Sequence, residues 1–164
     1  MTSTMEVADV EAKEVSQAQD LTYSFTVEQT PDEVFAAIND VLGWWSGEIE
    51  GETDKLGREW TYRYKDIHYS KQRITELVPG RRVVWQVMDS YLSFVDDKTE
   101  WNGTRVVFEI ARKGGKTEVR FTHAGLAAED ECFDKCSNAW GFYINLSLLG
   151  LIETGKGEPN KREQ

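Results

Sequence analysis

His123 is the side chain whose type and position best suit proton transfer or ligand orientation. It follows Val119 and Phe121 at a spacing of two residues, so on a β-strand its imidazole points to the same apolar side as those residues. An imidazole titrates near neutral pH, which allows it to orient a ligand or to act as an acid or base. The other interpretation is a core histidine that ties the last strand to the following helix. The lack of an evident carboxylate partner favours this structural interpretation.

Aromatic residues on the inward side of the expected elements are candidates for a cavity wall. Ligand pockets are mostly apolar with a few placed polar groups, and tyrosine hydroxyls can supply such groups. The alternative is an ordinary aromatic core that leaves no space. The candidate ligand-binding residues are Trp60, Tyr62, Trp85, Phe108, His123, Trp140 and Tyr143. Three further tryptophans, Trp44, Trp45 and Trp101, lie beside glycines and turns, which places them at the rim.

The two cysteines, Cys132 and Cys136, are four residues apart in an expected helix. This spacing puts both thiols on one helix face, but helical geometry disfavours a bond between them, so we expect reduced thiols in the core. A metal site would need more ligands. Besides carboxylates only His68 and His123 are present, and no CxxC or HxxxH spacing occurs, so we expect no metal.

Motifs of other enzyme classes do not occur in the sequence. There is no Ser-His-Asp order, nucleophile elbow, phosphate loop or dinucleotide fingerprint, so we assign no catalytic residue and expect no cofactor. Glu76 has an uncertain position in its expected strand, and we interpret it as a solvated strand-end acid. The motifs therefore give no support to a hydrolase, kinase or dehydrogenase.

The composition is that of one globular domain. The 164 residues are 40% hydrophobic and 12% aromatic, with six tryptophans, which suits a large aromatic interior or a lined pocket. The net charge of -10 repels phosphate backbones and anionic lipid surfaces, so we expect no nucleic-acid partner. The first residues show no signal-peptide pattern, and no later run has the apolar length of a membrane span. We therefore expect no membrane insertion and a cytoplasmic location.

The amino-terminal third contains a tail, a strand and a helix. Residues 1–20 are acidic and contain no aromatic residue, so we expect a mobile tail. From Leu21 to Val27 apolar and polar residues alternate, which predicts a strand. Thr30, Pro31 and Glu33 then form the pattern of a helix start with a capping box. A second short helix is expected over residues 41–45.

The rest of the chain predicts strands joined by tight turns and a final helix. Period-two runs predict strands at about 60–64, 69–78, 83–87, 106–110 and 119–123, although neither side of 69–78 is cleanly apolar. One long aromatic helix is expected from Glu129 to Thr154, ending at Gly155 and Gly157. Tight turns favour an antiparallel sheet, and strong curvature would bury both its aromatic face and the helix.

This order of elements and several short strings resemble the START-like or SRPBCC superfamily of helix-grip proteins, and within it the family similar to the activator of heat-shock-protein ATPase. The strings are Gly43-Trp44-Trp45, Thr75-Glu76-Leu77-Val78-Pro79 followed by Val83-Val84-Trp85, Glu100-Trp101-Asn102-Gly103-Thr104, Phe121-Thr122-His123-Ala124-Gly125-Leu126, and Trp140 with Glu153-Thr154-Gly155-Lys156-Gly157. The resemblance covers essentially Leu21 to Gly157.

The resemblance implies an α+β helix-grip fold. A curved antiparallel sheet of about six or seven strands wraps around a long C-terminal helix, with one or two short helices after the first strand. We expect one such domain over residues 21–157, followed by a short C-terminal tail over residues 158–164. The superfamily includes carriers of hydrophobic molecules, cyclases and chaperone regulators, so the fold alone does not determine the function.

Three functions fit the sequence and the resemblance. The first is noncatalytic binding of a small hydrophobic or aromatic ligand in a cavity between the sheet and the C-terminal helix. The second is a protein-interaction module similar to a chaperone ATPase activator, although the chain lacks the extra amino-terminal domain of the eukaryotic activators. The third is an enzyme similar to cyclases or hydratases, in which His123 and an interior tyrosine serve as acid and base.

Overall fold

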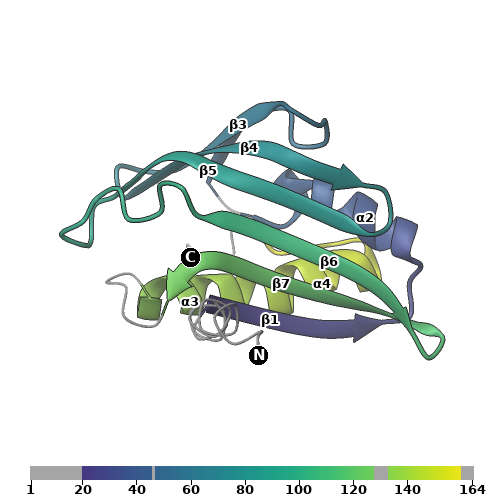
Figure 1. Ribbon diagram of the computed structural model, residues 1–164. Helices are drawn as coiled ribbons and strands as arrows, with labels where there is room; N and C mark the ends of the chain where they lie inside the picture. The colour runs from purple at the N-terminus through teal and green to yellow at the C-terminus, as the bar shows by residue number, and fades with distance from the viewer. Residues whose placement is uncertain (1–19, 46, 128–132, 160–164) are drawn as a thin grey trace, which may run out of the picture.

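The computed structural model describes residues 20–45, 47–127 and 133–159. In this part of the chain seven strands form one antiparallel sheet in the order β1-β7-β6-β5-β4-β3-β2. The sheet is curved, and the helices lie against one of its faces (Figure 1). This is the helix-grip fold expected from the sequence.

The strands are β1 (Asp20–Val27), β2 (Glu48–Gly51), β3 (Glu59–Tyr64), β4 (His68–Val78), β5 (Arg82–Leu92), β6 (Arg105–Lys113) and β7 (Lys116–Ala127). The helical segments are α2 (Pro31–Asn39), the 3₁₀ turn η1 (Val41–Gly43), α3 (Phe133–Phe142), the π-helical segment η2 (Tyr143–Leu148) and α4 (Leu149–Thr154). Strand β1 thus begins at Asp20, the last residue of the expected tail, and β2 is an edge strand that the sequence analysis did not anticipate.

Helix α2 begins as its sequence predicts. The hydroxyl of Thr30 accepts a hydrogen bond from the backbone N–H of Glu33 at 3.2 Å, and the backbone N–H of Thr30 donates to the Glu33 carboxylate at 2.9 Å. This reciprocal pair is a capping box, which satisfies two backbone donors that a helix start would otherwise leave without partners. Pro31 occupies the first helical position, where its missing N–H costs nothing.

Strand β4 contains residues 69–78, for which the sequence pattern did not show which side faces the core. The reason is that its inward positions are partly polar. Ser70, Gln72 and Ile74 are all buried, whereas Arg73 between them is exposed. The pairing of β4 with β5 also shifts register twice, between Lys71 and Gln72 and between Ile74 and Glu76. The buried positions still alternate, but Ser70 and Gln72 are polar, so a search for alternating apolar residues could not identify the inward side.

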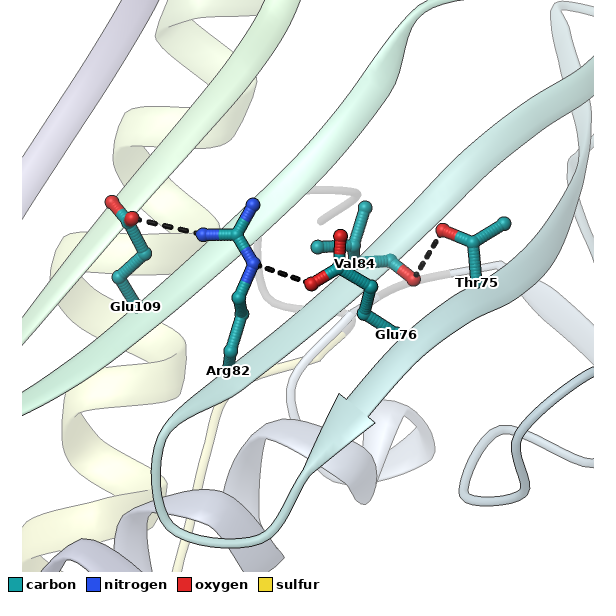
Figure 2. Close-up of polar contacts among 5 residues, drawn as sticks. All are labelled: Thr75, Glu76, Arg82, Val84 and Glu109. Carbon is teal, nitrogen blue, oxygen red and sulfur yellow. Dashed lines mark hydrogen bonds and ion pairs between the residues drawn. The ribbon is translucent and has the colours of Figure 1, made fainter.

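The outer face of the sheet carries ion pairs that cross three strands. Arg82 on β5 donates to Glu76 on β4 at 2.7 Å and to Glu109 on β6 at 2.9 Å, as Figure 2 shows. Beside them the Thr75 hydroxyl donates to the backbone oxygen of Val84 at 3.4 Å. The Glu76 side chain is 43% exposed, which agrees with its interpretation as a solvated acid. Such exposed pairs contribute at most about 1 kcal/mol each, so the buried face dominates stability.

The C-terminal helix is continuous from Phe133 to Thr154 but is not α-helical throughout. The expected start at Glu129 lies outside the described residues. In the middle, Tyr143–Leu148 forms a π-helical segment, in which each turn holds more residues than an α-turn. The helix ends as expected at Gly155, whose φ of 82° is the left-handed conformation that glycine adopts most easily.

Hydrogen bonds of the Tyr23 and Ser147 side chains attach this helix to the rest of the domain. The Tyr23 hydroxyl on β1 donates to the backbone oxygen of Ser137 at 2.7 Å. The Ser147 hydroxyl in η2 donates to the backbone oxygen of Trp44 at 2.8 Å and accepts the backbone N–H of Glu158 at 2.8 Å. The helix is therefore anchored at α3 and at the π-helical segment.

Candidate functional site

A cavity of about 400 Å³ lies between the sheet and the C-terminal helix. From the sheet side its lining comprises Trp45 after η1, Tyr62 and Tyr64 on β3, and Ile67 and His68 at the β3–β4 turn. The segment after β5 adds Ser93, Phe94 and Trp101, and the helix adds Lys135, Cys136, Ala139, Trp140 and Tyr143. The wall is therefore mainly aromatic.

The structure separates the seven candidate ligand-binding residues into two groups. Tyr62, Trp140 and Tyr143 line the cavity. The other four, Trp60, Trp85, Phe108 and His123, are buried but do not belong to the lining, which corrects their expected place in the wall.

The rings of Trp60, Trp85 and Phe108 pack against one another in the core and do not line the cavity. Trp85 lies edge-to-face against Trp60 with ring centroids 4.9 Å apart, and against Phe108 at 5.2 Å. These are ordinary distances for aromatic pairs in a core. Both interpretations in the sequence analysis thus apply to different residues: part of the aromatic set is a packed core, and part surrounds a space.

Three tryptophans expected at the rim are buried. Trp44 is 0% exposed and packs against Trp85 in the core, with ring centroids 6.3 Å apart. Trp45 and Trp101 are 5% and 2% exposed and both line the cavity. Trp45 stacks on Tyr62 with centroids 4.3 Å apart and planes 7° from parallel. The rim assignment is wrong because proximity to a glycine or turn in the sequence does not determine depth in the fold.

His123 is held in a chain of hydrogen bonds behind the cavity wall. The indole N–H of Trp140 can only donate, so it donates to Nδ1 of His123 at 3.1 Å. The imidazole proton therefore lies on Nε2, which donates to the Thr104 hydroxyl at 2.9 Å. That hydroxyl in turn donates to the backbone oxygen of Trp101 at 2.6 Å. Both nitrogens are thus used within the protein.

The electrostatics of His123 also favour its structural interpretation. Complete burial, together with the nearby His68, lowers the pKa of His123 from 6.5 to about 3. The imidazole is therefore neutral at neutral pH, with no free nitrogen to take or give a proton. Its contacts connect β7 to α3, as the structural interpretation expects.

His68 is a site residue that sequence reasoning considered only as a metal ligand. It lines the cavity and lies edge-to-face against Tyr62 and Trp101, with ring centroids 5.0 and 4.6 Å away. Its Nε2 is buried and has no hydrogen-bond partner among the described residues. Burial lowers the pKa of His68 to about 3, so this ring is also neutral. The sequence signal that could have suggested it is a lone histidine directly after a turn between aromatic strands.

Lys135 brings a charge to the opening of the cavity. It is exposed on the first turns of α3 while belonging to the lining. Its Nζ lies 5.3 Å from the centroid of the Phe94 ring, an attractive cation–π arrangement. Among the described residues that line the cavity none is an aspartate or glutamate.

The other features that bear on chemistry are few. Cys136 is disulfide-bonded, so our expectation of a reduced thiol there is wrong; Cys132 lies outside the described residues.

Within the described ranges, no three His, Cys, Asp or Glu side chains come together as a metal site. None of the described helices is long and apolar enough to cross a membrane.

The lining of the cavity is suited to binding a small molecule. It offers stacked aromatic rings, a neutral imidazole and one ammonium group at its opening. Among the described lining residues no carboxylate accompanies His68, and burial lowers the pKa of His68 to about 3, which makes its imidazole a poor proton acceptor at neutral pH.

Comparison with known proteins relates the chain to one family. The model of the family described as "Activator of Hsp90 ATPase homolog 1-like protein" matches residues 28–148. No curated protein sequence matches the chain.

Solved structures share the fold at low sequence identity. The solution structure of the Aha1 dimer from Colwellia psychrerythraea is 23% identical with a TM-score of 0.67, and the match covers 84% of this chain and 98% of that one. The crystal structure of DynU16, a protein in the dynemicin biosynthetic locus, is 15% identical with a TM-score of 0.64 over 85% of this chain and 49% of that one. A protein from Chromobacterium violaceum is 16% identical, with a TM-score of 0.61 over 83% and 98%. At these identities the likeness concerns the fold.

Proposed function

The chain belongs to the family of Activator of Hsp90 ATPase homolog 1-like proteins, and from this membership together with the cavity we propose that it binds a small hydrophobic or aromatic molecule without transforming it. The observation that carries the proposal is the aromatic cavity of about 400 Å³ between the sheet and the helix. Its volume lies within the range of about 300–1,000 Å³ that is usual for small-molecule sites.

The lining supports an aromatic ligand in particular. Trp140 and Tyr143 on the helix face the same space as Tyr62 and the Trp45 ring stacked on it. Aromatic pairs gain about 0.5–1.5 kcal/mol beyond the burial of their area, so a flat ring in this space would be favoured over a saturated molecule of equal size.

A noncatalytic role is supported by the lack of a carboxylate among the described lining residues and by the state of the two histidines. His123 lies behind the wall with both nitrogens engaged. His68 is neutral and is placed to exchange a hydrogen bond with a polar group on the ligand. It would then orient the ligand rather than change it.

A protein-interaction module is the second candidate. The family description names an ATPase activator, and three leucines are prominent on the surface: Leu42, Leu56 and Leu146 are 64%, 61% and 56% exposed. The acidic net charge would suit a basic partner. Single exposed leucines are nevertheless common on monomeric proteins, so this candidate remains second.

The test is calorimetric titration with 2-naphthol, a neutral aromatic probe, complemented by native mass spectrometry of freshly purified protein. We expect saturable binding with a negative heat-capacity change, because apolar surface is buried. Ala139→Phe adds a ring to the cavity lining and should weaken binding by about tenfold, equivalent to about 1.4 kcal/mol.

The matched control is Asn138→Phe, which adds the same ring to the neighbouring, exposed position of α3 outside the lining. It should bind 2-naphthol as the wild type does. The proposal would be overturned if 2-naphthol showed no saturable binding, or if the Ala139→Phe protein bound 2-naphthol as tightly as the wild type. The interaction module would then become the first candidate.

A further inference from the structure

The charge at the cavity opening narrows the class of ligand. The described lining residues include one lysine and no aspartate or glutamate, although the whole chain carries 29 acidic and 19 basic residues. Lys135 reaches this opening from α3, and the contact of its Nζ is with the Phe94 ring. No described carboxylate forms an ion pair with it. The ammonium group is therefore available to a ligand.

The acidic net charge does not prevent an anion from binding here. Charges on distant parts of the surface are screened beyond about 8 Å at physiological salt, so the field at the opening is determined by the groups close to it. Lys135 belongs to the lining whereas the adjacent, exposed Asp134 does not, so an anionic group in the cavity would meet the ammonium group of Lys135 and no described lining carboxylate. Because Lys135 is exposed, its attraction is that of a surface ion pair, which limits its size.

The body of the ligand and its charged group would contact different parts of the site. The buried rings of Trp140 and Tyr143 suit an aromatic body, whereas Lys135 lies where the cavity opens. A molecule with a carboxylate on one end of an aromatic ring system would contact both the buried rings and Lys135. A neutral aromatic molecule would gain only the contact with the rings.

We propose that the cavity is selective for aromatic molecules that carry an anionic group, and that Lys135 at the opening recognises this group. This inference rests on the proposed function, since it specifies the ligand of the same cavity. It also assigns Lys135 as a specificity-determining residue, with the apolar wall supplying the affinity common to charged and neutral ligands.

The experiment compares 2-naphthoate with 2-naphthamide, which have the same ring system and differ in charge, by calorimetric titration of the full chain. The wild type should bind 2-naphthoate about fivefold more tightly, the size of an exposed ion pair of about 1 kcal/mol. Lys135→Met keeps the apolar stem and removes the charge. It should abolish the preference, so that 2-naphthoate and 2-naphthamide bind the variant with equal affinity.

Lys65→Met is the matched control. Lys65 is also an exposed lysine with its Nζ over an aromatic ring, 5.2 Å from the centroid of Tyr64, but it is not part of the lining. Its replacement changes the net charge by the same amount as Lys135→Met, so it should retain the preference for 2-naphthoate. A general charge effect would instead reduce the preference equally in both variants and would overturn the inference.

The remaining outcomes distinguish this inference from the proposed function. Equal binding of the two probes by the wild type overturns the anion selectivity, and a preference that survives Lys135→Met overturns the assignment of Lys135. Either result leaves the aromatic cavity as proposed. If neither probe binds, the proposed function and the inference both fail.

Discussion

Acidification should destabilise this domain through its two buried histidines. The pKa values of His68 and His123 are lowered to about 3 in the folded protein, against 6.5 in the unfolded chain. In the window between these values the unfolded state binds two protons that the folded state does not, so the free energy of unfolding falls as the pH falls. The stabilising effect is present above pH 6.5 and is lost progressively towards pH 3.

The magnitude follows from the two pKa values. Each histidine should lower the free energy of unfolding by about 1 kcal/mol between pH 6 and pH 5, and both together by about 2 kcal/mol. By pH 4.5 the combined loss relative to pH 7 is about 5 kcal/mol, comparable with the whole stability of many small domains. The Glu59 carboxyl contributes at lower pH. A hydrogen bond from Arg73 lowers the pKa of Glu59, so the stabilisation by this carboxylate is lost only as the pH falls below 4.5, its pKa in the unfolded chain.

The assay is urea denaturation at a series of pH values from 7 to 5, followed by far-ultraviolet circular dichroism. His123→Gln cannot titrate in this range, so the slope between pH 6 and pH 5 should fall to about 1 kcal/mol per pH unit, even if the variant is less stable throughout. His68→Gln should halve the slope in the same way. A wild-type slope well below about 1 kcal/mol per pH unit, or slopes that neither variant changes, would refute the neutral, buried state of these rings.

Three further predictions concern stability in chemical or thermal denaturation. Trp140→Phe removes the indole donor and leaves Nδ1 of His123 without a partner, so it should cost about 1–3 kcal/mol, and Trp140→Ala about 3–5 kcal/mol; a cost below about 1 kcal/mol for the alanine variant would place this ring outside the core. Gly157→Ala should destabilise by about 1–3 kcal/mol, because a Cβ there would clash with the backbone oxygen of Gly43, and unchanged urea unfolding would contradict that close approach. Deletion of residues 1–19 should leave the melting temperature nearly unchanged, whereas a drop of more than about 5 °C would show that the tail contributes to the domain.

Local patterns allowed most of the fold to be predicted. The alternation from Leu21 to Val27, the capping box at Thr30 and the glycine at 155 each depend on neighbours in the sequence, and each occurs in the structure. Strand β2 escaped notice because Glu48-Ile49-Glu50-Gly51 has a single apolar residue and lies at a sheet edge. Its pairing with β3 is a tertiary contact that no local pattern announces.

The cavity was less accessible to sequence reasoning than the fold. Strand parity correctly placed Tyr62 and Trp85 inside, but parity identifies a face of the sheet and not the depth at which packing closes over it. Trp44 packs on Trp85 in the core, whereas the adjacent Trp45 stacks on Tyr62 at the cavity, so neighbouring residues of one segment lie at different depths. The roles of Lys135 and His68 depend on the same long-range packing.

The π-helical segment Tyr143–Leu148 makes the chain tolerant of an unusual kind of change. A π-turn holds one residue more than the surrounding helix requires, so a one-residue deletion there could convert Phe133–Thr154 into a regular α-helix. Each α-helical residue turns the helix by about 100°, so the deletion would rotate α3 relative to α4 by that angle. Trp140 would leave His123, and a different set of side chains would face the cavity. In evolution, a single codon gained or lost at this segment could therefore exchange the ligand-facing side of the helix at once, while the sheet sequence stayed the same.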